Sequence, residues 1–125
     1  MIVVSAASGA FGRLVIDRRL ARRPADRIVA AVRHPDGAAD LAARGVEVRL
    51  DDYDAPATLR TAFEGADRLL LISSPELDSA RRAGQHRAAV EAACDAGVGR
   101  TPSVRAGCIR LFDGLPCPCS PSPWW

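Results

Sequence analysis

Four short apolar segments, each followed by a stretch with helical spacing, constrain the fold of this chain most. The segments are residues 2–5, 28–33, 46–50 and 68–73, and each is a largely continuous apolar run without a strict alternation of apolar and polar residues. Strands of that kind are typical of a parallel sheet that is covered on both faces. Strand–helix repeats with right-handed crossovers then give a doubly wound α/β sheet.

The stretches between the strands have the 3.6-residue periodicity of helices. Helices are expected over residues 10–22, 38–44, 55–64 and 79–96. Pro24, Gly45 and Gly97 are placed to end three of them, and Pro56 is placed near the start of the third. The first hundred residues thus hold four strand–helix units of a Rossmann-like fold, with the fourth strand beside the first.

Two of the helices have an apolar face in this spacing. The first helix is expected to bury Phe11, Leu14 and Val15. The fourth helix has an apolar stripe with these members: His86, Val90, Ala93, Cys94 and Gly97. A histidine in such a stripe is more often packed and hydrogen-bonded than catalytic, and we expect this of His86. Cys94 is expected to be a buried, inert thiol.

Composition excludes several classes of protein. A chain of 125 residues suggests one domain, and a net charge of +2 does not suggest a nucleic-acid partner. All 17 basic residues are arginine, so the number of arginines is a poor guide to function. There is no signal-peptide pattern, and no apolar run approaches the roughly 18 residues of a membrane span. We therefore expect a cytoplasmic protein without a membrane partner.

The last 25 residues break the pattern. A fifth strand is expected after residue 100, but residues 101–125 hold five of the nine prolines, three of the four cysteines and both tryptophans. We interpret residues 1–100 as an incomplete dinucleotide-binding domain and residues 101–125 as an irregular tail, frameshifted or otherwise truncated. A disordered extension is the second interpretation. A small metal site is the third, but the cysteines lack the paired spacing of structural zinc, so no metal is expected.

The turn between the first strand and the first helix predicts a phosphate-binding loop. Gly9 can allow close approach of a phosphate, and Gly12 can allow close packing of helix on strand. Ala6 occupies the position of the tight turn, at a cost that depends on whether its φ is positive. The predicted cofactor-binding residues of this loop are Ser5, Ala6, Ser8, Gly9, Ala10, Phe11 and Gly12.

Two further strand ends are candidate cofactor contacts. Arg33 ends the second strand where NAD-specific sites carry an acidic residue, and an arginine there fits the 2′-phosphate of NADP. NADP is therefore favoured over NAD. Ser73 and Ser74 end the fourth strand, which borders the point where the strand order reverses, so they are expected beside the nicotinamide and its ribose. The alternative is a simple loop without a ligand contact.

Asp51, Asp52 and Asp54 cluster around Tyr53 after the third strand. That strand is expected at the adenine end of the site, so a catalytic role is rejected here. Asp52 and Tyr53 are expected at the edge of the adenine. The alternative is a carboxylate cluster at the start of a helix.

Five blocks occur in the order and spacing of one known family: VVSAASGAFGRLV, IVAAVRHP, GVEVRLDDYDAPATL, DRLLLISSPE and GQHRAAVEAACDAGV. The chain resembles the NmrA-like, atypical short-chain dehydrogenases/reductases, and within them the NAD(P)H:quinone oxidoreductase type, from residue 1 to about residue 100. Family members use a T-G-A-T-G-x-x-G turn, which is matched here by residues 5–12 with alanine at position 6.

The resemblance implies the same cofactor contacts. Arg33 would hold the 2′-phosphate, Asp52 and Tyr53 would lie at the adenine, and residues 73–77 would line the nicotinamide side. Full-length relatives would transfer hydride from NADPH to a quinone-type acceptor, and the substrate-binding part of the family has no counterpart in these 125 residues. No catalytic residue is identified. A non-catalytic dinucleotide sensor and an inactive truncated product are the alternatives.

Overall fold

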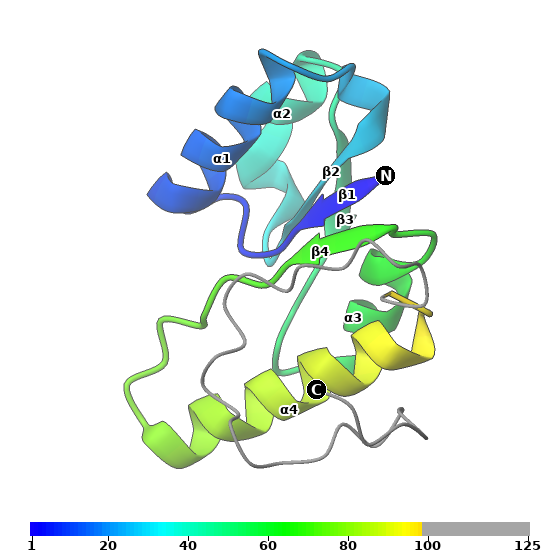
Figure 1. Cartoon of the computed structure of the whole chain (residues 1–125). Coiled ribbons are helices and arrows are strands. Elements are labelled where there is room, and N and C mark those ends of the chain that lie inside the picture. Colours follow the sequence, from blue (N-terminus) through cyan, green and yellow to red (C-terminus); the bar gives the residue numbers. More distant parts are fainter. Residues whose placement is uncertain (99–125) are drawn as a thin grey trace.

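The computed structural model describes residues 1–98, which form a parallel sheet covered by helices (Figure 1). The strands are β1 (Ile2–Val4), β2 (Ile28–Val32), β3 (Glu47–Leu50) and β4 (Arg68–Leu70). Their order is β3-β2-β1-β4, and every neighbouring pair is parallel. The Rossmann-like prediction is confirmed, with β1 and β4 adjacent. The expected fifth strand and the tail lie outside the described residues.

Four helices follow the strands, as the periodicity predicts. They are α1 (Ala10–Leu20), α2 (Ala39–Ala43), α3 (Pro56–Phe63) and α4 (Ser79–Asp95). Short 3-10 turns precede β2 and α2, over Ala25–Arg27 and Pro35–Ala38. Most predicted ends are within about two residues of the observed ones. None of the helices in residues 1–98 is long and apolar enough to span a membrane.

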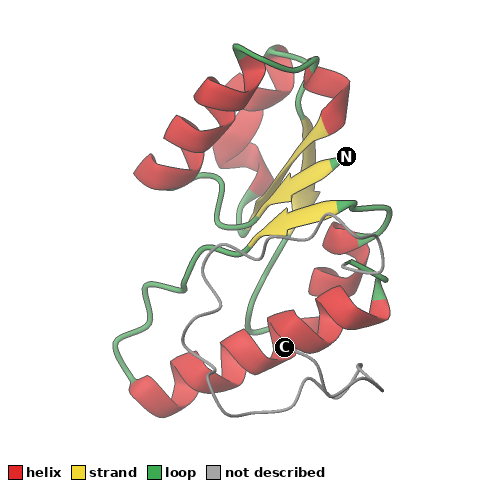
Figure 2. Ribbon diagram, in the orientation of Figure 1, coloured by secondary structure: helices red, strands yellow, loops and turns green. Residues whose placement is uncertain are grey.

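The core has two halves, one on each face of the sheet (Figures 1 and 2). Val3 and Val29 face α3 and α4, where they join Leu59 and Phe63. Val4, Ile28 and Val32 face the opposite side, which α1 and α2 cover. Successive residues of β1 and β2 are therefore both buried, which explains why these strands are continuous apolar runs.

The predicted apolar face of α1 is wrong for Phe11 and Leu14 and confirmed for Val15, which is half-buried and packs against the core. Phe11 and Leu14 are 59% and 53% exposed, whereas Gly12 and Ile16 are buried. The reason is the close approach of α1 to the loop before it. A Cβ on Gly12 would lie 2.6 Å from Ala7 Cα, so the backbone of the helix, and not a large side chain, fills this contact.

The stripe predicted for α4 is displaced by one residue. The buried residues of this helix are Gln85, Ala89 and Ala92, and they face α3 and the sheet. Cys94 is half-buried, so the prediction of a buried thiol is wrong. Alanine occupies two of the three buried positions, and its small side chain allows α4 to pack closely.

Candidate functional site

The loops that follow β1, β2, β3 and β4 all leave the sheet at its carboxyl edge (Figure 2). The strand order reverses between β1 and β4, because the chain extends from β1 to one side and returns to the other. Ligands of open α/β sheets bind outside this edge, at such a reversal. The predicted cofactor residues come from these loops and from the start of α1.

The loop between β1 and α1 contains a strained residue. Ala6 has a φ of 46°, the left-handed region that favours glycine. Two hydrogen bonds hold the turn: the Ala7 amide donates to Ala31 O at 3.0 Å, and the Gly9 amide donates to Ala6 O at 3.1 Å. The alanine therefore adopts the glycine conformation of the turn, which settles the question that the sequence left open.

The N-terminus of α1 is open to an anion. Its N-cap residue, Gly9, is extended and caps no amide through a side chain, and the first turn has no acidic residue. The amides of Ala10, Phe11 and Gly12 therefore have no partner within the helix. Ser8, Gly9 and Ala10 are exposed beside them. Such a row of amides fits the oxygens of a phosphate.

The two glycines of the loop differ in their surroundings. A Cβ on Gly9 would lie 3.4 Å from Ala6 O, an ordinary contact, so the protein itself leaves room there. A Cβ on Gly12 would meet backbone atoms of Ala6 and Ala7 at 2.6–3.0 Å. The predicted packing role of Gly12 is thereby confirmed.

Arg13 fastens this loop, a role that the sequence analysis did not assign. Its guanidinium donates to Ser8 O at 3.1 Å and to Gly37 O at 3.0 Å, and it is paired with Asp40. The loop is therefore joined to the segment that precedes α2. No local pattern distinguishes Arg13 from the other arginines of α1.

Ser5 and Tyr53 form a polar contact inside the fold. Ser5 is fully buried, and its Oγ accepts the Ile72 amide at 2.8 Å. The Tyr53 hydroxyl lies 3.0 Å from Ser5 Oγ and donates to Ile72 O at 2.8 Å. Burial raises the pKa of Tyr53, so the phenol stays neutral. In this conformation the Ser5 hydroxyl is used within the protein and does not face a phosphate.

This contact also explains why β4 is shorter than predicted. The Ser5 amide donates to Leu70 O, as in a regular strand pair. The Ile72 amide, however, donates to the side-chain Oγ of Ser5 and not to a backbone carbonyl. The backbone ladder therefore stops at Leu70, and residues 71–73 continue as an extended loop.

Asp51 is a buried carboxylate below the candidate site. It is 4% exposed, and neither carboxyl oxygen has a hydrogen-bond partner among residues 1–98. Burial raises the pKa of Asp51 to about 6, an increase that the backbone of Ala6 partly offsets and Asp52 slightly enlarges. The sequence grouped Asp51 with its neighbours and did not predict its burial.

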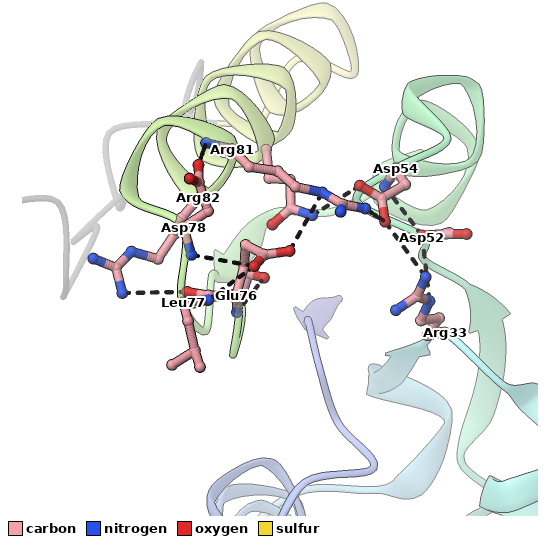
Figure 3. A network of polar contacts seen from close by, with 10 residues as sticks. Arg33, Asp52, Asp54, Glu76, Leu77, Asp78, Arg81 and Arg82 are labelled. Atoms are coloured by element: carbon pink, nitrogen blue, oxygen red, sulfur yellow. Dashed lines mark hydrogen bonds and ion pairs between the residues drawn. The ribbon is translucent and has the colours of Figure 1, made fainter.

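Arg33, Asp52 and Asp54 form a charged cluster with α4 (Figure 3). Arg33 lies 3.6 Å from Asp52 Oδ1 and 3.4 Å from Asp54 Oδ2, and its side chain is 60% exposed. Asp54 also accepts hydrogen bonds from Arg81 at 2.9 Å and from Gln85 at 2.8 Å. The sequence analysis assigned no role to Arg81 or Gln85.

Ser73 and Ser74 meet His86 at the end of the extended loop. The Ser74 amide donates to His86 Nε2 at 3.3 Å, and Ser73 Oγ lies 3.2 Å from the same nitrogen. Burial, with a smaller effect of Arg82, lowers the pKa of His86, in keeping with a neutral ring that accepts these bonds. The prediction of a hydrogen-bonded histidine is confirmed.

The structure therefore gathers most of the predicted residues along one edge. The amides of α1, the exposed Arg33 and the exposed Ser73 are candidate donors for an anionic dinucleotide, and Gly9 leaves room for its approach. Ser74 is buried, and its amide donates to His86. Ser5 and Tyr53 lie beneath this edge. Within residues 1–98, no three histidine, cysteine or acidic side chains are grouped to hold a metal ion.

Comparisons with known proteins match this geometry. A family model described as NAD(P)H-binding covers residues 6–114. Quinone oxidoreductase 2 of Escherichia coli K12 is 46% identical over 98 residues, which are 78% of this chain and 34% of that protein. An NmrA-like family domain-containing oxidoreductase of Aspergillus flavus is 32% identical over 98 residues, which are 77% of this chain and 32% of that protein.

A solved structure shows the same arrangement of elements. The triphenylmethane reductase of Citrobacter sp., complexed with NADP(H), superposes with a TM-score of 0.77 at 46% identity. The match covers 78% of this chain and 34% of the reductase. The chain thus spans about a third of the length of each of these relatives. The resemblance to NmrA-like dehydrogenases predicted from the sequence is confirmed.

Proposed function

The chain belongs to the NAD(P)H-binding family, and we propose that residues 1–100 bind NADP(H) at the carboxyl edge of the sheet. The observation that carries this proposal is Arg33. It stands at the end of β2 with a 60% exposed side chain, and its shortest ion pair within the described part of the chain is 3.4 Å. An arginine that is this weakly engaged is available to form a bidentate pair with a 2′-phosphate.

The other residues would contact different parts of the dinucleotide. The amides of Ala10, Phe11 and Gly12, with the exposed Ser8 and Gly9, would hold the pyrophosphate. Ala6 shapes the turn that aims these amides.

The remaining contacts lie at the two ends of the site. Asp52 would lie toward the adenine, and Ser73 and Ser74 would lie on the nicotinamide side. Ser5 and Tyr53 would support the site from below, because their hydroxyls join β1 to the residues after β4.

The relatives also suggest an activity for the whole protein. A bound NADPH supplies a hydride to an acceptor. We propose a quinone-type acceptor, because the E. coli relative is named a quinone oxidoreductase. In residues 1–98, no side chain is assigned to act on the acceptor, so these residues bind and orient the cofactor. A cytoplasmic location belongs to the same proposal, and subcellular fractionation tests it.

Titration calorimetry with NADPH and NADH tests the binding proposal. Arg33→Ala should weaken NADPH binding roughly tenfold or more, the range expected for a hydrogen-bonded charge, and leave NADH binding unchanged. Arg18→Ala is the matched control, since Arg18 is exposed on α1 and away from this edge. If Arg33→Ala weakened the binding of NADPH and NADH equally, or left the affinity for NADPH unchanged, the assigned role of Arg33 would be refuted.

Oxidation of NADPH in the presence of a simple quinone tests the activity separately. The rate with quinone is compared with the rate without it, and with the rate of Arg33→Ala at saturating NADPH. Because Arg33 is assigned to binding alone, the variant should recover the full rate when the cofactor saturates. A quinone-independent rate would remove the proposed acceptor without affecting the binding proposal.

A further inference from the structure

Three side chains donate to the carboxylate of Asp54, and their donor–acceptor distances differ. Gln85 donates to Asp54 Oδ1 at 2.8 Å, and Arg81 donates to Asp54 Oδ2 at 2.9 Å. Arg33 reaches the same Oδ2 atom at 3.4 Å. Figure 3 shows Arg81 reaching Asp54 from α4, while Arg33 approaches from the end of β2. Both oxygens of Asp54 are therefore held by α4 at short distance, and Arg33 makes the longer contact.

The charges around Asp54 support this ranking. The pKa of Asp54 lies below its ordinary value, first because of the bond from Gln85, then because of Arg81, with Arg33 the smallest of the named causes. Gln85 is buried, which fixes its amide. Arg81 is held from a second side by Glu76, at 3.3 Å.

The second partner of Arg33 is also weakly engaged. Asp52 Oδ1 lies 3.6 Å from Arg33 Nε, beyond hydrogen-bond distance, and it accepts the Asp54 amide at 3.0 Å. The local backbone therefore competes for Asp52, as α4 competes for Asp54. As a result Arg33 faces two carboxylates and is firmly bound to neither.

We propose that Arg81 determines cofactor specificity by holding Asp54 away from Arg33, which keeps the guanidinium of Arg33 free for the 2′-phosphate of NADP(H). The proposal rests on the binding function proposed above. Arg81 is a positioning residue that acts through Asp54. Without it, Oδ2 of Asp54 is open to Arg33, and a phosphate has to compete with a carboxylate for the same guanidinium. NADH, which has no 2′-phosphate, does not use Arg33 and is unaffected.

The test measures the ratio of NADH to NADPH dissociation constants by calorimetry, after thermal melts confirm that each variant is folded. Arg81→Ala should weaken NADPH binding about two- to fivefold, the range that a partly exposed ion pair supports, and leave NADH binding unchanged. Arg82→Ala removes the same charge one residue away. Because the Arg82 side chain, among residues 1–98, donates only to Glu76 O, at 3.4 Å, this control should bind both cofactors as the wild type does.

A double variant separates positioning from simple charge. If Arg81 acts through Asp54, Arg81→Ala should have no effect on NADPH binding in an Asp54→Asn background. If the effect persists there, or if Arg82→Ala matches Arg81→Ala, or if NADH weakens equally, the proposal is overturned. The wild type and the Arg33→Ala variant distinguish the levels of the argument. Absence of NADPH binding to the wild type refutes the binding function, and an unchanged NADPH affinity in Arg33→Ala refutes the role of Arg33 and with it this proposal. A loss in Arg33→Ala with no effect of Arg81→Ala refutes only the role of Arg81.

Discussion

Asp51→Asn is expected to stabilise the protein at neutral pH. The side chain of Asp51 is 4% exposed, and its carboxyl oxygens have no hydrogen-bond partner among residues 1–98. A buried carboxylate in such surroundings is disfavoured relative to its protonated form. Asparagine has nearly the same shape and no charge, so it takes the place of the protonated acid at every pH.

The size of the effect comes from the pKa of Asp51, which burial raises from 3.8 to about 6. Each unit corresponds to about 1.4 kcal/mol, so ionised Asp51 lowers the free energy of unfolding by about 3 kcal/mol, as an order of magnitude. The folded-state pKa lies above the unfolded-state value. The penalty is therefore absent below about pH 4, grows between about pH 4 and 6, and is constant above that.

Urea unfolding of wild type and Asp51→Asn measures this difference at several pH values. The variant should gain little below about pH 4.5 and gain most of the full amount above about pH 6.5. Asp36→Asn is the control, because Asp36 is exposed, and its difference from wild type should not follow this pH dependence. A gain of the same size at all pH values, or a loss at neutral pH, would show that the burial argument is mistaken.

Two substitutions test the loop between β1 and α1. Ala6→Gly should raise the free energy of unfolding by roughly 0.5–1 kcal/mol. The backbone strain that alanine has at a φ of 46° is relieved, and this gain should exceed the cost of the larger backbone entropy of glycine in the unfolded chain. The same change at Ala21, whose φ is −65°, should lower the free energy of unfolding, and a loss at both positions would contradict the strain at Ala6. Gly12→Ala should destabilise the protein by roughly 1–3 kcal/mol and weaken NADPH binding, because its Cβ would meet the Ala7 backbone at 2.6 Å. Wild-type stability in this variant, measured by urea unfolding, would mean that α1 can move away without cost.

The fold could be predicted because local pattern and topology agree. Continuous apolar strands require two covered faces, and a phosphate-binding turn after the first strand favours the doubly wound order in which β4 lies beside β1. The rotation of α1 could not be predicted in the same way. Phe11 and Leu14 suggest the buried side by their size, but Gly12 lets the helix approach with its backbone, which turns those large side chains outward.

The site could be predicted where function depends on position along a strand. Arg33 and Ser73 follow strand ends, so the sequence places them at one edge of the sheet. The contacts between loops could not be predicted, since Tyr53 meets Ser5 across 48 residues and Arg81 meets Asp54 across 27. In a chain with 17 arginines and no lysine, Arg81 has no local feature that distinguishes it.

Three carboxylates beside the candidate site would repel a negatively charged ligand, and each of them has a different environment. Asp51, Asp52 and Asp54 lie at the edge of the sheet where we propose that a polyanionic cofactor binds, and each negative charge there would weaken that binding. Burial raises the pKa of Asp51 to about 6, so its negative charge is lost when the pH falls below that value. Asp52 accepts a backbone amide of its own loop. Asp54 is held by α4, through Arg81 and Gln85. If the cofactor binds as proposed, affinity for the 2′-phosphate should depend less on the net charge of the chain, +2, than on which partner holds each carboxylate.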